Sequence, residues 1–194
     1  MAEVFAIIAG VMLLAAGPPY LIDIIKGKTK PERATWFIWS VLGVIALISQ
    51  IQLHGGWSLV FIGFDAFGSI LVFSLSLHYG VGGWTRLDKI ALSIAALGLA
   101  ISLIVKVPTI ALLGVVLADM SGAILTMIKT YKAPATETTI TWLFVGTASL
   151  FGALSVGKLD ASLLIYPVYL TLGTYGVVVA QMLGKAARPA SQKA

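Results

Sequence analysis

The sequence predicts an all-α integral membrane protein with seven transmembrane helices. Hydrophobic residues make up 59% of the 194 residues and charged residues only 11%, so nearly the whole chain can lie in lipid. A backbone inside lipid must satisfy its own hydrogen bonds, which restricts the fold to helices or closed barrels. Each of seven apolar runs is close to the crossing length of about 17 to 25 residues. The runs cover residues 5–25, 35–53, 57–77, 90–105, 107–128, 140–156 and 161–183.

The lysines and arginines between these runs predict the orientation. In a protein with short loops, the cytoplasmic face carries the excess of basic residues. If all seven runs cross, only Lys106 and Lys158 of the thirteen basic residues lie outside. If the short run 90–105 does not cross, eight of the basic residues lie on one side of the membrane and five on the other. The stronger asymmetry favours seven crossings. We therefore expect an outside N-terminus and a cytoplasmic C-terminus. The eleven cytoplasmic residues are then Lys26, Lys28, Lys30, Arg33, Arg86, Lys89, Lys129, Lys132, Lys185, Arg188 and Lys193.

The first run is expected to remain as a helix. The residues before it, Met1, Ala2 and Glu3, lack the basic segment that opens a cleaved signal peptide. The net charge of +5 is explained by loops that orient the chain in a membrane, so we do not expect nucleic-acid binding. The chain has no cysteine, which excludes disulfides and thiolate metal sites.

The segments that close the first and fifth runs repeat each other. Residues 24–31 read IIKGKTKP and residues 127–134 read MIKTYKAP, and each precedes a Thr-Trp pair that opens the next helix. These pairs, at 35–36 and 141–142, align after three extra residues in the second loop. Four crossings separate the copies, so both point the same way, as in parallel repeats. Chance similarity between two helix ends rich in lysine and proline is the alternative.

The repeat predicts a 3+1+3 arrangement of helices. Residues 1–82 form the first three-helix repeat, 83–106 the linker helix, 107–185 the second three-helix repeat and 186–194 a short cytoplasmic tail.

This architecture resembles the SWEET and PQ-loop transporter superfamily over the whole chain. The family's Pro-Gln motif corresponds to Pro18-Pro19-Tyr20, while the second copy, at 120–122, reads Met-Ser-Gly without proline. More narrowly, residues 18–39 and 118–134 are similar to uncharacterised bacterial PQ-loop-type membrane proteins. The resemblance implies a transporter in the plasma membrane, the inner membrane of a bacterium.

Two aspartates lie inside apolar runs and are the main candidates for function. Asp65 lies near the middle of run 57–77 and Asp119 at the centre of run 107–128. A carboxyl at the bilayer centre costs about 2.5 to 3.5 kcal/mol on insertion scales, and such residues commonly face a cavity or a proton pathway. The alternative is a protonated carboxyl that only packs, hydrogen-bonded across a helix interface.

The resemblance also implies which positions line a pocket. Sugar carriers of the family place an asparagine in the third helix of each repeat, and this sequence has no asparagine. Asp65 is the candidate for that position in the first repeat, while Tyr166, Thr171 and Thr174 remain open alternatives in the second. An acid in place of an amide favours proton coupling or a substrate that carries an amine.

Aromatic residues and prolines complete the predicted site. Trp36 and Trp39 are three residues apart, which places them on about the same helix face, and a tryptophan face can stack on a sugar or a cation. Prolines remove backbone donors and bend helices, and the resembled family uses such a bend as a hinge. The predicted pocket residues are Trp36, Trp39, Tyr166, Tyr169 and Thr171 with the two aspartates, and the predicted hinges are Pro18, Pro19 and Pro167. The helix glycines at 10, 17, 63 and 68 are expected to allow close packing.

The sequence therefore predicts a small-solute carrier, facilitative or proton-coupled, with a site near the bilayer midplane between the repeats. The substrate class stays open among amines, amino acids, sugars and vitamins, and a homo-oligomer is possible. A receptor or scaffold with the same bundle is the alternative. We expect no enzyme and no cofactor, because zinc, phosphate-loop and serine-triad patterns are not seen and run 161–183 has no lysine for a retinal Schiff base.

Overall fold

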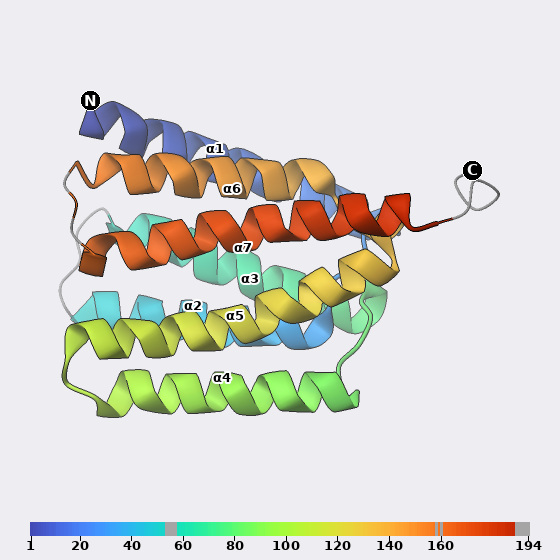
Figure 1. Cartoon of the computed structure of the whole chain (residues 1–194), viewed down its shortest axis with the longest axis horizontal. Helices are drawn as coiled ribbons and strands as arrows, with labels where there is room; N and C mark the ends of the chain where they lie inside the picture. Colours follow the sequence, from blue (N-terminus) through green and yellow to red (C-terminus); the bar gives the residue numbers. More distant parts are fainter. Residues whose placement is uncertain (53–57, 158, 160, 189–194) are drawn as a thin grey trace. The chain divides into compact units, whose positions relative to one another are not determined.

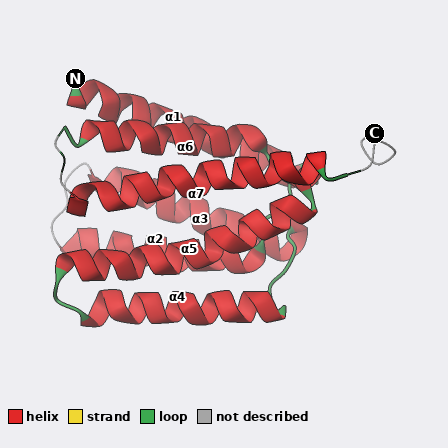
Figure 2. Cartoon of the chain, viewed as in Figure 1, coloured by secondary structure: helices red, strands yellow, loops and turns green. Residues whose placement is uncertain are grey.

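The computed structural model describes residues 1–52, 58–157, 159 and 161–188, and this part of the chain is almost entirely helical (Figure 2). The predicted all-α class is confirmed for these residues, and each helix falls on one of the apolar runs. In order, the helices are α1 (Ala2–Ile25), α2 (Arg33–Gln52), α3 (Ser58–Tyr79), α4 (Arg86–Ile104), α5 (Pro108–Lys132), the 3-10 turn η1 (Pro134–Thr136), α6 (Thr139–Ser155) and α7 (Ala161–Ala186).

Four of these helices are long and apolar enough to cross a membrane, within the residues described. They are α1, α4, α5 over Thr109–Lys132 and α7 over Leu164–Ala186. The described apolar parts of α2, α3 and α6 are shorter. Length and composition therefore support a membrane protein. The seven crossings, the 3+1+3 repeat and the orientation stay predictions.

Contacts divide the chain into two compact units. Unit 1 consists of Met1–Thr29 with Thr126–Ala194, and unit 2 of Lys30–Leu125. In unit 1, α1 packs along α6 and α6 packs along α7 (Figure 1). In unit 2, α2 packs along α3 and also contacts α4. The predicted boundaries, after residues 82, 106 and 185, divide the chain by sequence repeat, whereas the two units divide it by contacts. The predicted boundaries therefore stay a prediction.

Each unit combines the first helix of one predicted repeat with the second and third helices of the other. In unit 1, Thr141 at the start of α6 donates from Oγ1 to the carbonyl of Ala16 on α1, at 3.0 Å. In unit 2, Thr35 near the start of α2 donates from Oγ1 to the carbonyl of Gly122 on α5, at 2.7 Å. In both Thr-Trp pairs, the threonine hydroxyl thus donates a hydrogen bond to a backbone carbonyl of another helix.

Glycines allow a close contact between α4 and α5 in unit 2, but they are not the predicted ones. An added Cβ at Gly98 on α4 would lie 2.5 Å from the carbonyl oxygen of Gly114 on α5, and the converse distance is also 2.5 Å. The prediction that four other glycines allow close helix packing was wrong, because no described atom lies within 4 Å of a Cβ built at any of them. Those four are Gly10, Gly17, Gly63 and Gly68.

We expect Gly98→Ala to lower the free energy of unfolding by about 1 to 3 kcal/mol, because the methyl group forces α4 away from α5. The measurement is the unfolding transition in detergent. Gly68→Ala on α3 is the matched control, and it should be neutral or stabilising because it has space and gains helix propensity. Equal effects of the two substitutions would show that the α4–α5 contact is not tight.

Candidate functional site

Asp119, the leading sequence candidate, is buried on α5 in unit 2. It is 8% exposed, and its neighbours Ala118 and Ser121 are also buried. Gly122 follows it by about one helical turn and packs against Thr35 on α2. The structure therefore places a carboxyl where α5 meets α2, on a helix long and apolar enough to cross a membrane.

The two tryptophans predicted to share a face of α2 contact each other directly. The rings of Trp36 and Trp39 meet edge to face, with centroids 5.0 Å apart and an interplanar angle of 85°. Trp39 also reaches α5, because its Nε1 lies 3.5 Å from the Cβ position of Gly122. Trp39 thus lies one turn from Asp119 along α5, within unit 2.

The candidates on α7 lie in unit 1. The rings of Tyr166 and Tyr169 are tilted against each other, with centroids 6.3 Å apart. Thr171 donates from Oγ1 to the carbonyl of Pro167 at 2.8 Å, and Thr174 donates to the carbonyl of Leu170 at 2.6 Å. Both threonine hydroxyls therefore bond to their own helix, and Thr174 is the more buried of the two.

The predicted hinges lie inside continuous helices. Pro18 and Pro19 are interior residues of α1, and Pro167 is an interior residue of α7. The carbonyl of Pro167 accepts a hydrogen bond from the hydroxyl of Thr171, so a side chain bonds to the backbone of the proline itself. Asp65 lies on α3, and its side chain is outside the described residues.

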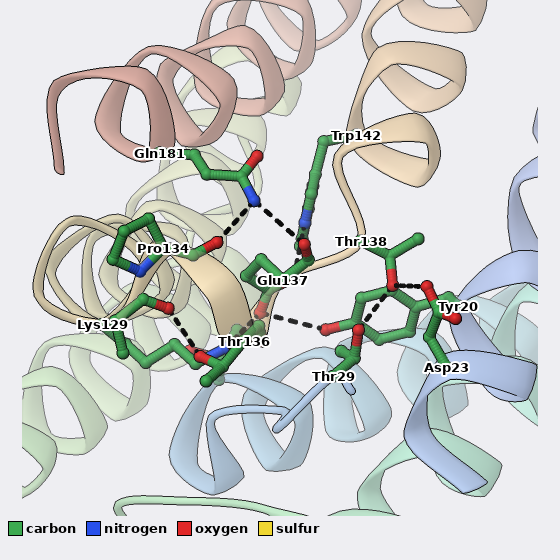
Figure 3. Close-up of polar contacts among 12 residues, drawn as sticks. Tyr20, Asp23, Thr29, Lys129, Pro134, Thr136, Glu137, Thr138, Trp142 and Gln181 are labelled. Carbon is green, nitrogen blue, oxygen red and sulfur yellow. Dashed lines mark hydrogen bonds and ion pairs between the residues drawn. The ribbon is translucent and has the colours of Figure 1, made fainter. Parts of the chain in front are cut away.

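A cluster of polar residues in unit 1 surrounds Glu137, which was not predicted from the sequence (Figure 3). Its side chain is fully buried, and Lys129 Nζ lies 2.6 Å from Oε1. Trp142 donates from Nε1 to Oε2 at 2.7 Å, and the hydroxyl of Tyr20 lies 3.4 Å from Oε1. One carboxylate thus joins α1, α5 and α6.

Further hydrogen bonds extend this cluster to α7 and to the end of α1. Gln181 on α7 donates from Nε2 to the carbonyls of Pro134 and Glu137, at 2.7 and 2.9 Å. Thr138 donates to Asp23 Oδ2 at 2.9 Å and is hydrogen-bonded to Thr29 at 2.5 Å. We call these residues the Glu137 network: Tyr20, Asp23, Thr29, Lys129, Pro134, Glu137, Thr138, Trp142 and Gln181.

Unit 2 also buries acids at the corresponding loop. Glu32 precedes α2 and is 4% exposed, and Asp88 in the first turn of α4 is 3% exposed. Burial raises the pKa of the Glu32 carboxyl above its ordinary value; hydrogen bonds from Thr35 and Ala34 oppose the rise, and the charge of Asp88 adds to it. Glu32 therefore holds a proton more tightly than an exposed glutamate.

The sequence carried a signal for both buried glutamates. Each stands alone as the acid between the loop proline and the Thr-Trp pair, Glu32 after Pro31 and Glu137 after Pro134. Neither glutamate was predicted to be buried, because a charged residue in a short loop is ordinarily solvated.

No protein-family model, curated protein or solved structure matches this chain. The resemblance to SWEET and PQ-loop transporters therefore stays an expectation. Among the described residues, no group of three or more histidine, aspartate or glutamate side chains could hold a metal ion.

We expect Lys129→Met to lower the free energy of unfolding by about 3 to 5 kcal/mol, because it leaves Glu137 buried without its cation. Unfolding of the full chain in detergent measures this. Adding Glu137→Gln to the same variant should restore part of the loss, since the uncompensated charge is then gone.

Lys26→Met is the matched control for that experiment. Lys26 is the residue that the repeat aligns with Lys129, and it is exposed. Its replacement should change the free energy of unfolding by less than about 0.5 kcal/mol. Equal losses from the two methionine variants would contradict a special role for the ion pair with Glu137.

Proposed function

We propose that the protein is a membrane carrier of a small solute, facilitative or proton-coupled, in which Asp119 binds a proton or a cationic group. The observation that carries the proposal is the burial of this carboxyl, 8% exposed, on the membrane-length helix α5. An acid in such a position costs about 2.5 to 3.5 kcal/mol on insertion scales, and acids retained there commonly serve transport or proton relay.

The surroundings of Asp119 support this function. Trp39 lies against the next turn of α5, and its ring packs on Trp36. An aromatic face beside a carboxyl is the combination that attracts ammonium groups, since the ring adds a cation–π interaction to the charge. A substrate with an amine group therefore fits this part of unit 2 better than a neutral sugar.

The Glu137 network favours a second candidate, a receptor or scaffold without transport. A buried ion pair with several further hydrogen bonds ties the ends of four helices in unit 1. Such networks rigidify the elements that they join. A rigid bundle suits a receptor or scaffold, while a carrier requires helices that move.

Uptake by vesicles that contain the purified full-length protein tests the two candidates. A panel of amines, amino acids, sugars and vitamins is offered with and without a pH gradient. We expect saturable uptake of at least one solute. Failure of the whole panel, together with no solute that stabilises the protein, would favour the receptor or scaffold.

Asp119→Asn should reduce solute uptake at least tenfold or abolish its response to the pH gradient, because an amide neither binds a proton nor pairs with a cation. Glu3→Gln, at the exposed start of α1, is the matched control and should transport like the wild type. Unchanged uptake and unchanged pH response in Asp119→Asn would contradict the role given to this carboxyl.

A further inference from the structure

The two repeated loops each bury one glutamate, but among the described residues only Glu137 forms an ion pair. Glu137 is paired with Lys129 at 2.6 Å. Lys26, the residue that the repeat aligns with Lys129, is exposed and belongs to unit 1, whereas Glu32 belongs to unit 2. A buried charge without a cation must be stabilised by hydrogen bonds or must take up a proton.

The hydrogen bonds of Glu32 account for only one of its two oxygens. Oε2 accepts the backbone N–H of Thr35 at 2.6 Å, which caps the start of α2. Oε1 is buried and has no hydrogen-bond partner among the described residues. Glu32 therefore presents one satisfied oxygen and one unsatisfied oxygen, and leaving a buried charged acceptor unsatisfied is costly.

The loop between α3 and α4 closes over the unsatisfied oxygen. The backbone N–H of Arg33 donates to the carbonyl of Val81 and that of Val81 donates to the carbonyl of Pro31, both at 2.9 Å. Gly82 then follows with a positive φ of 73°, and a Cβ at this position would collide with Oε1 of Glu32. The loop backbone therefore lies directly against the carboxyl, and only glycine fits there.

Arg33, the cation that follows Glu32 in the chain, bonds to backbone carbonyls. Arg33 donates from Nε to the carbonyl of Ser76 at 2.9 Å and from Nη1 to the carbonyl of Gly82 at 2.8 Å. Its guanidinium thus bonds to one carbonyl of α3, that of Ser76, and to one carbonyl of the α3–α4 loop, that of Gly82. In the described residues, Arg33 forms no ion pair with Glu32. The ion pair found there is that of Lys129 with Glu137, at 2.6 Å.

A second acid faces the same loop. Asp88 Oδ2 accepts the backbone N–H groups of Gly83 and Thr85, at 2.7 and 2.8 Å, and closes a capping box with Thr85. Its charge acts on Glu32 and opposes ionisation there. The charged or titratable residues of the loops beside Glu32 and of the helix ends that they join are Lys30, Arg33, His78, Tyr79, Arg86, Asp88 and Lys89.

We propose that Glu32 is a proton-binding site that controls the loop between α3 and α4. With a proton on the carboxyl, the loop closes over Oε1 without a buried charge. Without the proton, a carboxylate with one unsatisfied oxygen is buried against Gly82, and opening the loop lets water hydrogen-bond to that oxygen. The proposal concerns the fold of unit 2 and does not depend on transport or on Asp119.

The direction of the pH effect follows from the sign of the shift. A carboxyl whose pKa is higher in the folded loop than in the open loop stabilises the closed loop at low pH. That stabilisation is lost as the pH rises through the pKa of the closed form. Because one proton is involved, the ratio of closed to open loop falls by up to about tenfold for each pH unit between the ordinary pKa of an exposed glutamate and the raised pKa of the closed form, and it levels off above that pKa.

Amide hydrogen exchange of the full-length protein in detergent tests this, after correction for the intrinsic pH dependence of exchange. We expect the protection of the N–H groups of Val81, Gly83 and Thr85 to fall as the pH rises. Glu32→Gln mimics the protonated acid and should keep these amides protected at every pH. Glu137→Gln changes the other buried glutamate and should leave the pH profile of this loop as in the wild type.

Asp88→Asn provides a second variant if Glu32→Gln does not fold. It removes the neighbouring negative charge while keeping an oxygen that can cap α4, so the midpoint of the loop's pH profile should move to lower pH. A wild-type loop whose protection does not change with pH, a Glu32→Gln loop that keeps the wild-type profile, or an unmoved midpoint in Asp88→Asn would each overturn the proposal.

Discussion

The ion pair between Lys129 and Glu137 is the interaction on which the arrangement of unit 1 depends. It lies where α5 ends and α6 is about to begin, and Trp142, Tyr20 and Gln181 complete the hydrogen bonds of this turn. Taking two charges out of water is costly, and the cost is recovered only if geometry and further hydrogen bonds are good. The helices of unit 1 must therefore meet in one register at this end.

The same constraint acts differently on unit 2. A glutamate is again buried in the loop before the Thr-Trp pair, and the threonine again bonds to the first helix of the other repeat. Among the described residues no lysine pairs with Glu32, whose Oε2 caps α2 and whose Oε1 has no hydrogen-bond partner. The loop before α6 thus buries its glutamate in an ion pair, whereas we propose that the loop before α2 responds to pH.

The helices could be predicted from the sequence because the apolar runs are long and the charges between them are few. Burial of Asp119 and the contact between Trp36 and Trp39 also follow from position and spacing alone. The pairing of α1 with α6 could not be predicted, since helix periodicity does not say which helices meet. The same holds for the tight Gly98–Gly114 contact, and for Glu32 and Glu137, because a loop acid is buried only when distant segments close over it.

The central claim is that two loops of similar sequence each bury a glutamate and that, among the described residues, only Glu137 has an ion-pair partner. The chain has three glutamates, so selective labelling of their side-chain carboxyls and titration by NMR follows each one separately. We expect one resonance, absent from Glu32→Gln, to titrate above the ordinary range of glutamate. A Glu32 resonance that titrates within or below that range would contradict the account.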